Sequence, residues 1–150
     1  MITDEQAQAI VAAERAVEND LTKANKILVR QLIEEVWNTG NYEQLDVLAA
    51  PAFAESTKWL NQMTRMAFPD CHDTIDDLIA EGDKVVVRWT MRGTHLGEWP
   101  APWGPIPPTG KPVTFSAIHI FRFADGKIVE RWAQVDTLGI LQQINALPAR

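Results

Sequence analysis

The sequence predicts a single α+β domain, with helices in its first half and antiparallel strands in its second. Up to Phe68 most apolar residues recur at helical spacing, whereas from His72 onward they alternate in short runs rich in β-branched and aromatic residues. Asp125-Gly126, which stands between two such runs, is typical of a two-residue hairpin turn. Helices followed by strands indicate a curved, mostly antiparallel sheet with the helices covering one face.

Composition narrows the class of protein. A chain of 150 residues is long enough to bury a sizeable core as one domain. A formal net charge of −6 argues against nucleic acid or an anionic membrane as partner, because both need clustered Lys and Arg. The single cysteine, Cys71, excludes an internal disulfide and a multi-cysteine zinc site, and no metal site is expected. With no apolar leader or membrane-spanning run, we expect a cytoplasmic protein.

The first two predicted helices differ in strength. A capping box at Thr3 opens an Ala-rich helix over 3–21, whose apolar stripe is thin. A stronger helix is predicted over 23–38, where large apolar residues mark a buried face. We therefore interpret residues 1–22 as an extra N-terminal helix and 25–144 as the core of the domain.

Prolines delimit the next elements. A short helix begins at Asn41 and is predicted to end at Pro51. A short strand over 52–56 and a helix over 57–68, ended by Pro69, are predicted to follow.

The second half predicts strands and one stiff loop. Six of the nine prolines fall within 96–112, so this segment is predicted to be a loop and not an interior strand. Strands are predicted over 72–80, 84–95, 113–124 and 127–135, with a short helix over 137–144.

The last hairpin carries the most chemically suggestive residues. A two-residue turn would place His119 opposite Trp132 and Asp136 opposite Phe115, so that a carboxylate and an imidazole share an aromatic face. Two plainer interpretations stay open: Asp136 as the N-cap of the last helix, and His119 as a core residue. A one-residue bulge would also change this pairing.

Several motifs together carry a resemblance to a known family. The chain resembles the SnoaL-like polyketide cyclases, the ester-cyclase-like branch of the NTF2-like superfamily. Four segments carry this resemblance: WNTGNYEQLDVL, GTH at 93–95, PTGK at 108–111 and RFADGKIVERWAQVD at 122–136. The resemblance covers about residues 25–144. It implies a cone-shaped α+β barrel enclosing one apolar cavity, and a homodimer formed through the convex sheet face or the extra helix.

The resemblance also implies a chemistry. Asp136 matches the family's general base, which removes an acidic α-proton from a polyketide ester and starts an aldol ring closure without metal or cofactor. His119 and His95 match positions that steady the enolate oxygen. An aromatic surrounding would raise the pKa of a carboxyl toward a value useful for such a base. The expected walls for a small apolar or aromatic substrate are Trp37, Trp59, Trp89, Trp99, Trp103, Phe115, Phe121 and Trp132.

Two other functions stay open. Hydrolases and epoxide-opening enzymes of the same superfamily use an Asp to activate water, and they usually need a second carboxylate and an Arg in the cavity. Arg122 and Arg131 are both expected to face outward. A non-catalytic ligand-binding or dimerisation module is the third possibility. The chain also differs from the family in two places. The loop at 99–107 is longer and richer in Trp and Pro than is usual, which affects the expected substrate class. The family's early histidine has no match within 53–56, which affects the expected acid–base partner.

Overall fold

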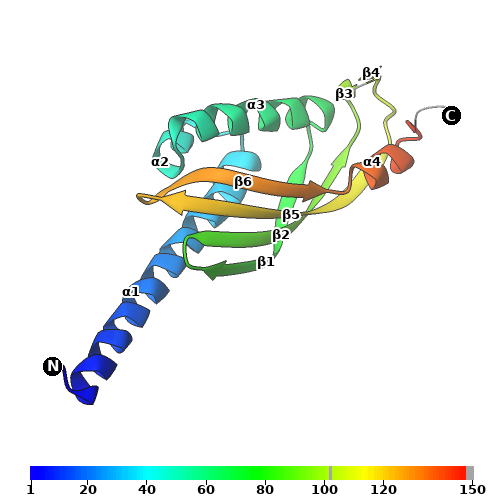
Figure 1. Cartoon of the computed structure of the whole chain (residues 1–150). Helices are drawn as coiled ribbons and strands as arrows, with labels where there is room; N and C mark the ends of the chain where they lie inside the picture. The colour runs from blue at the N-terminus through cyan, green and yellow to red at the C-terminus, as the bar shows by residue number, and fades with distance from the viewer. Residues whose placement is uncertain (102, 148–150) are drawn as a thin grey trace.

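Helices precede an antiparallel sheet, as the sequence predicts (Figure 1). The computed structural model describes residues 1–101 and 103–147. Its elements are α1 (Asp4–Gln31), η1 (Leu32–Trp37), η2 (Tyr42–Gln44), α2 (Leu45–Leu48), α3 (Pro51–Ala67), β1 (His72–Glu81), β2 (Lys84–Thr94), β3 (Trp99–Ala101), β4 (Gly104–Ile106), β5 (Pro112–Ala124), β6 (Lys127–Val135) and α4 (Thr137–Gln143). The α+β prediction is confirmed, although the sheet is curved and open rather than closed into a barrel.

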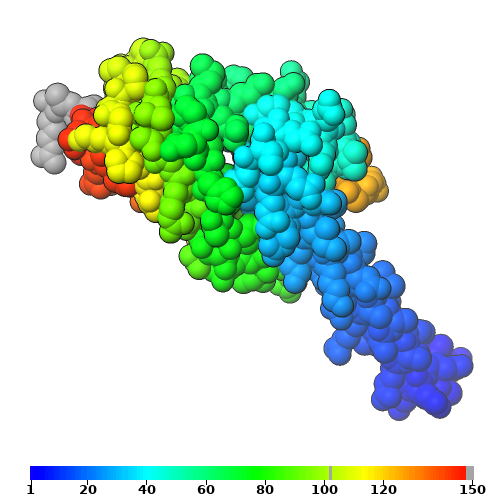
Figure 2. Space-filling model, turned by 180° about the vertical axis from the view of Figure 1, so that it is seen from behind, coloured from blue at the N-terminus to red at the C-terminus, as the bar shows by residue number. Residues whose placement is uncertain are grey.

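The first two predicted helices are one continuous helix. The Thr3 capping box is present, and α1 then runs without a break to Gln31, where the chain continues as the π-helical segment η1. The predicted break near residue 22 is wrong because no Gly or Pro interrupts the helix there. The first half of α1 extends away from the body (Figure 2), whereas Val29 is fully buried. Among the described residues, no helix is long and apolar enough to cross a membrane.

Pro51 begins a helix instead of ending one. It occupies the first turn of α3, where its fixed φ suits the helix and its missing N–H costs no hydrogen bond. The short strand predicted over 52–56 is therefore wrong. Phe53, Ala54 and Thr57 instead lie on the buried face of α3, at helical spacing.

The main sheet has the strand order β1-β2-β5-β6 and is antiparallel throughout. α3 lies across one face of this sheet (Figure 1), and Trp37 at the end of η1 packs against Phe121 of β5 on the same side. The segment between β2 and β5 adds no strand to the main sheet, as predicted, but β3 and β4 within it pair with each other. The core consequently lies between the helices and one face of a single sheet.

The hairpin between β5 and β6 contains a bulge. Asp125 and Gly126 form the expected two-residue turn, with φ of 51° and 74°. The pairing then shifts by one residue, because Val129 has no partner between Ile128 and Glu130.

This bulge changes which residues of β6 face the helices. His119 pairs with Ala133, not with Trp132 as predicted, and the predicted register is wrong from Glu130 onward. Arg131 now occupies the face of the sheet shared with His119, while Trp132 lies on the opposite face.

Candidate active site

One cavity lies between the inner face of the sheet, the end of η1 and α3. Its volume is about 270 Å³. Its apolar lining consists of Trp37, Leu60, Phe68, Trp89, Met91, Trp99, Phe115, Ala133, Val135 and Ile140. Its polar lining consists of Thr57, Asn61, Thr64, Asp73, His119, Arg131 and Thr137. Aromatic walls with a few polar groups are typical of a site for a small organic ligand.

The mouth of the cavity lies between α3 and the end of β6. Leu60 on α3 is 40% exposed and Val135 on β6 is also 40% exposed, although both line the cavity. Ala133 and Thr137 beside Val135 are exposed as well. A ligand can therefore enter between these residues and meet buried groups further in.

His119 stands in the aromatic part of the cavity. Its ring meets Trp37 and Trp89 edge-on, with centroid distances of 5.5 and 5.3 Å. It is 3% exposed, and neither ring nitrogen has a hydrogen-bond partner. Burial, with a smaller effect from the positive charge of Arg131, lowers the pKa of His119 to about 3. His119 is therefore neutral near pH 7 and offers one N–H donor and one acceptor nitrogen.

Asp73 places a carboxyl group in the same cavity. It lies near the start of β1, opposite Met91, and is 8% exposed. Burial raises the pKa of Asp73 to about 7, although the positive charge of Arg65 opposes the shift. A carboxyl group with such a pKa can both accept and return a proton near neutral pH.

Asn38 fixes the backbone that carries Asp73. Its Nδ2 donates to the carbonyl oxygen of Asp73 at 2.9 Å, and its Oδ1 accepts from the Asp73 N–H at 2.7 Å. Arg65 donates in turn to the carbonyl oxygens of Trp37 and Asn38, at 3.1 and 3.2 Å. These contacts tie the start of β1 to the end of η1.

Sequence reasoning missed Asp73, although a signal was present. Asp73 and Ile75 have the same parity in β1 and therefore lie on the same face, ahead of the bulge at Asp76. The neighbouring Asp76 and Asp77 pair with Arg88 on the outer face, at 3.3 and 2.6 Å, so the whole acidic run resembles a solvated surface.

Arg131 was expected to face outward, and that expectation is wrong. The bulge at Val129 turns Arg131 inward, where its guanidinium carbon lies 5.9 Å from the centre of the Phe53 ring. Its Nη1 is buried without a hydrogen-bond partner, and no described acidic residue forms an ion pair with Arg131. Burial lowers the pKa of Arg131 from its usual value.

The predicted walls divide into three groups. Trp37, Trp89, Trp99 and Phe115 line the cavity, as does His119. Phe121 is fully buried behind them and packs against His119 with a centroid distance of 5.8 Å. The structure places three other predicted walls outside the lining, with exposed fractions of 62%, 50% and 46%, namely Trp59, Trp103 and Trp132.

Asp136, the base predicted from the sequence, lies at the N-terminus of α4. Its Oδ1 accepts a hydrogen bond from the Gly139 N–H at 2.9 Å, which is the geometry of an N-cap. Asp136 is exposed and is not part of the cavity lining. It also does not lie opposite Phe115, because its N–H bonds to the carbonyl oxygen of Ser116.

His95 is fully buried but serves the loop that follows β2. Its Nδ1 lies 3.0 Å from Thr109 Oγ1, and its ring packs on Phe68 at 5.5 Å. Burial lowers the pKa of His95. His95 does not line the cavity, so its structural contacts hold the segment 96–112 in place.

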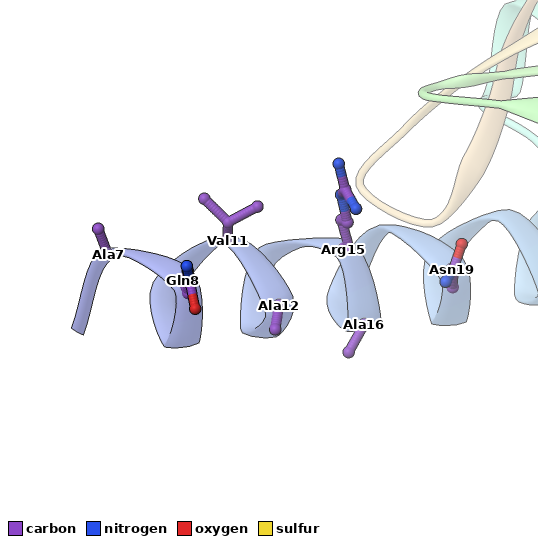
Figure 3. Close-up of a pocket in the computed structure, with 7 residues that line it drawn as sticks. All are labelled: Ala7, Gln8, Val11, Ala12, Arg15, Ala16 and Asn19. Carbon is purple, nitrogen blue, oxygen red and sulfur yellow. The ribbon is translucent and has the colours of Figure 1, made fainter. Parts of the chain in front are cut away.

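A second hollow, on the exposed half of α1, is a weaker candidate. Figure 3 shows that all seven residues around it come from this single helix and that Val11 and Ala12 point to different sides. No other element forms an opposite wall, so this surface encloses no ligand.

Comparisons with known proteins agree with the fold. The pattern of the family described as SnoaL-like polyketide cyclase matches residues 27–144, and the chain belongs to this family, which is NTF2-like in fold. No curated protein matches the chain.

Solved structures give the same result. TsrD from Streptomyces laurentii is 27% identical, with a TM-score of 0.74 over 83% of this chain and 97% of that one. A putative SnoaL-like polyketide cyclase from Jannaschia sp. CCS1 is 25% identical, with a TM-score of 0.75 over 85% and 96%. Wild-type IdmH from Streptomyces antibioticus, a putative polyketide cyclase, is 30% identical, with a TM-score of 0.67 over 81% and 98%.

Proposed function

We propose that the protein is a cofactor-free acid–base enzyme of the cyclase type, acting on a small aromatic or apolar carbonyl compound. The observation that carries this proposal is the pairing of two groups in one aromatic cavity: the Asp73 carboxyl, with a pKa of about 7, and the neutral imidazole of His119. Membership of the polyketide cyclase family supports the same reaction class.

The proposed reaction begins with proton transfer from an acidic C–H of the substrate to an Asp73 oxygen. The electron pair of the broken C–H bond forms an enolate, whose oxygen accepts a hydrogen bond from the His119 N–H. The enolate carbon then attacks a second carbonyl of the same molecule, and the new alkoxide takes the proton back from Asp73. One well-placed donor to such an oxyanion is typically worth about 3–4 kcal/mol.

Asp136 is the competing candidate for the base, because the family resemblance assigns that role to it. Replacing either Asp by Asn separates the two. Asp136→Asn is a well-matched control, because Asn caps a helix about as well as Asp does. Asp73→Asn removes the titrating carboxyl and keeps its size.

The assay follows exchange of the acidic α-protons of 2-tetralone, a small aromatic ketone, into deuterated water by NMR. We expect wild-type protein and Asp136→Asn to accelerate the exchange, and Asp73→Asn to lose about 10²–10⁴-fold in rate. The reverse pattern would assign the base to Asp136. If the wild type accelerates the exchange no more than the two variants do, the result would favour the non-catalytic ligand-binding module.

A water-activating hydrolase or epoxide-opening enzyme is the second candidate function. The position of Arg131 in the cavity lining favours it, because such enzymes usually place an Arg in the cavity. Among the described residues, however, Asp73 is the one carboxylate of the lining. Oxygen from labelled water appearing in the product would favour this candidate over ring closure.

A homodimer is also proposed, through the outer face of the sheet. Ile79, Val86, Ile120 and Trp132 pair across all four strands and form an apolar row on that face. Ile79 is 64% exposed and Trp132 is 46% exposed. Sedimentation should give a dimer for the wild type and a monomer for Trp132→Asp; a wild-type monomer would contradict this proposal.

A further inference from the structure

The unpaired polar atoms of the cavity are mostly N–H donors. Arg131 Nη1, both ring nitrogens of His119, and the Nε1 atoms of Trp37 and Trp89 are buried without a hydrogen-bond partner. All four residues line the same cavity. Buried donors are normally paired, so a group of them in one cavity indicates a ligand that supplies acceptors.

The cost of this arrangement is large. A buried donor without a partner costs about 1–3 kcal/mol, and a buried charge costs more. No described carboxylate offsets the charge of Arg131, since Asp73 stands on β1, at the opposite edge of the sheet from β6. On the β6 side of the cavity, the titratable groups are therefore the cationic Arg131 of β6 and the neutral imidazole of His119 on the neighbouring strand β5.

We propose that the cavity takes an organic anion, whose carboxylate is held by the guanidinium of Arg131. A guanidinium suits a carboxylate because its N–H groups match the two oxygens. The indole N–H groups of Trp37 and Trp89 would donate to further oxygens of the same ligand. This inference rests on the proposed function for one point only, the position of the reacting carbon.

The anchor also orients the ligand. With the carboxylate at the β6 side, the rest of the molecule extends along the wall formed by Trp89 and Phe115 toward Asp73 on β1. The volume of about 270 Å³ is near the lower limit of roughly 300–1,000 Å³ for organic-ligand pockets. The substrate class is therefore a small aryl or polyenyl carboxylic acid with an acidic C–H, and not a bulky fused-ring ester.

The test compares cinnamate with methyl cinnamate, which differ in the anionic group. Calorimetric titration of the wild type should give an affinity for cinnamate about tenfold or more above that for the ester, which corresponds to about 1.4 kcal/mol. Arg131→Met should lose this preference, and Arg131→Lys should keep part of it. Arg92→Met is the matched control, because Arg92 is an exposed arginine on the outer face without an ion pair.

Equal affinity of the wild type for the two probes, including no measurable binding of either, would overturn the proposal. The proposal would also be overturned if a folded Arg131→Met kept its preference for cinnamate over the ester, or if Arg92→Met lost that preference as much as Arg131→Met does. Thermal melting identifies variants that fail to fold, and if Arg131→Met is one of them, Arg131→Lys decides. Asp73→Asn should keep the preference for cinnamate even where proton exchange is lost, so failure of the anion site and failure of the proposed base give different results.

Discussion

Trp89 meets His119 almost at a right angle, with ring centroids 5.3 Å apart and an interplanar angle of 85°. The indole edge keeps water away from the imidazole without offering it a hydrogen bond. The protonation state of His119 is therefore set by the aromatic residues around it, and it can be tested through the pH dependence of stability.

His119→Gln should change how stability depends on pH. Because the pKa of His119 is about 3 in the native protein and its ordinary value is 6.5, the native state binds fewer protons than the unfolded state between these values. The free energy of unfolding of the wild type is therefore not reduced by His119 above about pH 6.5, and it decreases as the pH falls toward 3. The total decrease is on the order of 3–5 kcal/mol. Urea unfolding across this range should show a smaller loss for His119→Gln; the same loss in both proteins would contradict the assigned burial.

Asp73→Asn should have the opposite effect. The pKa of Asp73 is raised from 3.8 to about 7, so the native state binds more protons than the unfolded state within this window. The wild type loses stability from this group as the pH rises from about 4 to 7, by on the order of 4 kcal/mol.

Since Asn cannot ionise, the stability of Asp73→Asn relative to wild type should increase between pH 4 and pH 8. Asp136→Asn, measured by the same urea titration, is the comparison at an exposed carboxylate. A difference between Asp73→Asn and wild type that stays constant with pH would show that Asp73 is not desolvated.

Gly97→Ala should disturb the wall of the cavity formed by Trp99. A Cβ at position 97 would collide with the carbonyl oxygen of Met66, which belongs to the backbone of α3. The N–H groups of Leu96 and Gly97 both bond to the Ala67 carbonyl oxygen, at 3.1 and 3.0 Å, so the segment has little freedom to move away.

We expect Gly97→Ala to lower the free energy of unfolding by about 1–3 kcal/mol and to weaken binding of cinnamate. Gly82→Ala, in the turn between β1 and β2, is the control, because it adds strain at a positive φ of 56° without any contact to the cavity. Denaturant unfolding and calorimetry measure both effects. Unchanged binding in Gly97→Ala would show that the position of Trp99 does not depend on this close approach.

The tryptophans should divide by function as they divide by burial. Trp59→Phe changes a side chain that is 62% exposed, so stability should stay within about 0.5 kcal/mol and cinnamate binding should be unchanged. Trp89→Phe removes an indole N–H and part of a wall beside His119, so binding should weaken severalfold. Calorimetric titration of both variants gives the comparison, and equal effects would exclude Trp89 as a wall.

The sequence predicts β5 well because alternation is a local property of a strand. Phe115, Ala117, His119 and Phe121 share one face by parity alone, and all four are buried. The helix α3 is predicted only in part, since Pro51 is compatible with the end of one helix and with the first turn of the next.

The candidate site was harder to predict than the fold. The bulge at Val129 leaves no mark in the alternation of β6, yet it brings Arg131 into the cavity and moves Trp132 to the outer face. Asp73 is hidden in an acidic run, and its burial depends on the end of η1 and on α3, which are distant in sequence. Asp136 has the composition of a catalytic carboxylate and the contacts of a helix cap.

The unpaired Val129 has a consequence for the history of this family. If Val129 were paired and the bulge were absent, Trp132 and Gln134 would face the cavity in place of Arg131 and Ala133, with every letter of the strand unchanged. Loss of the Val129 codon, in contrast, would give regular pairing and keep Arg131 opposite Phe121. Whether the strand accommodates Val129 as a bulge therefore decides whether a basic or an aromatic side chain faces the cavity. Relatives with similar last strands can therefore differ in substrate, and their reactive positions correspond only after the bulge has been matched.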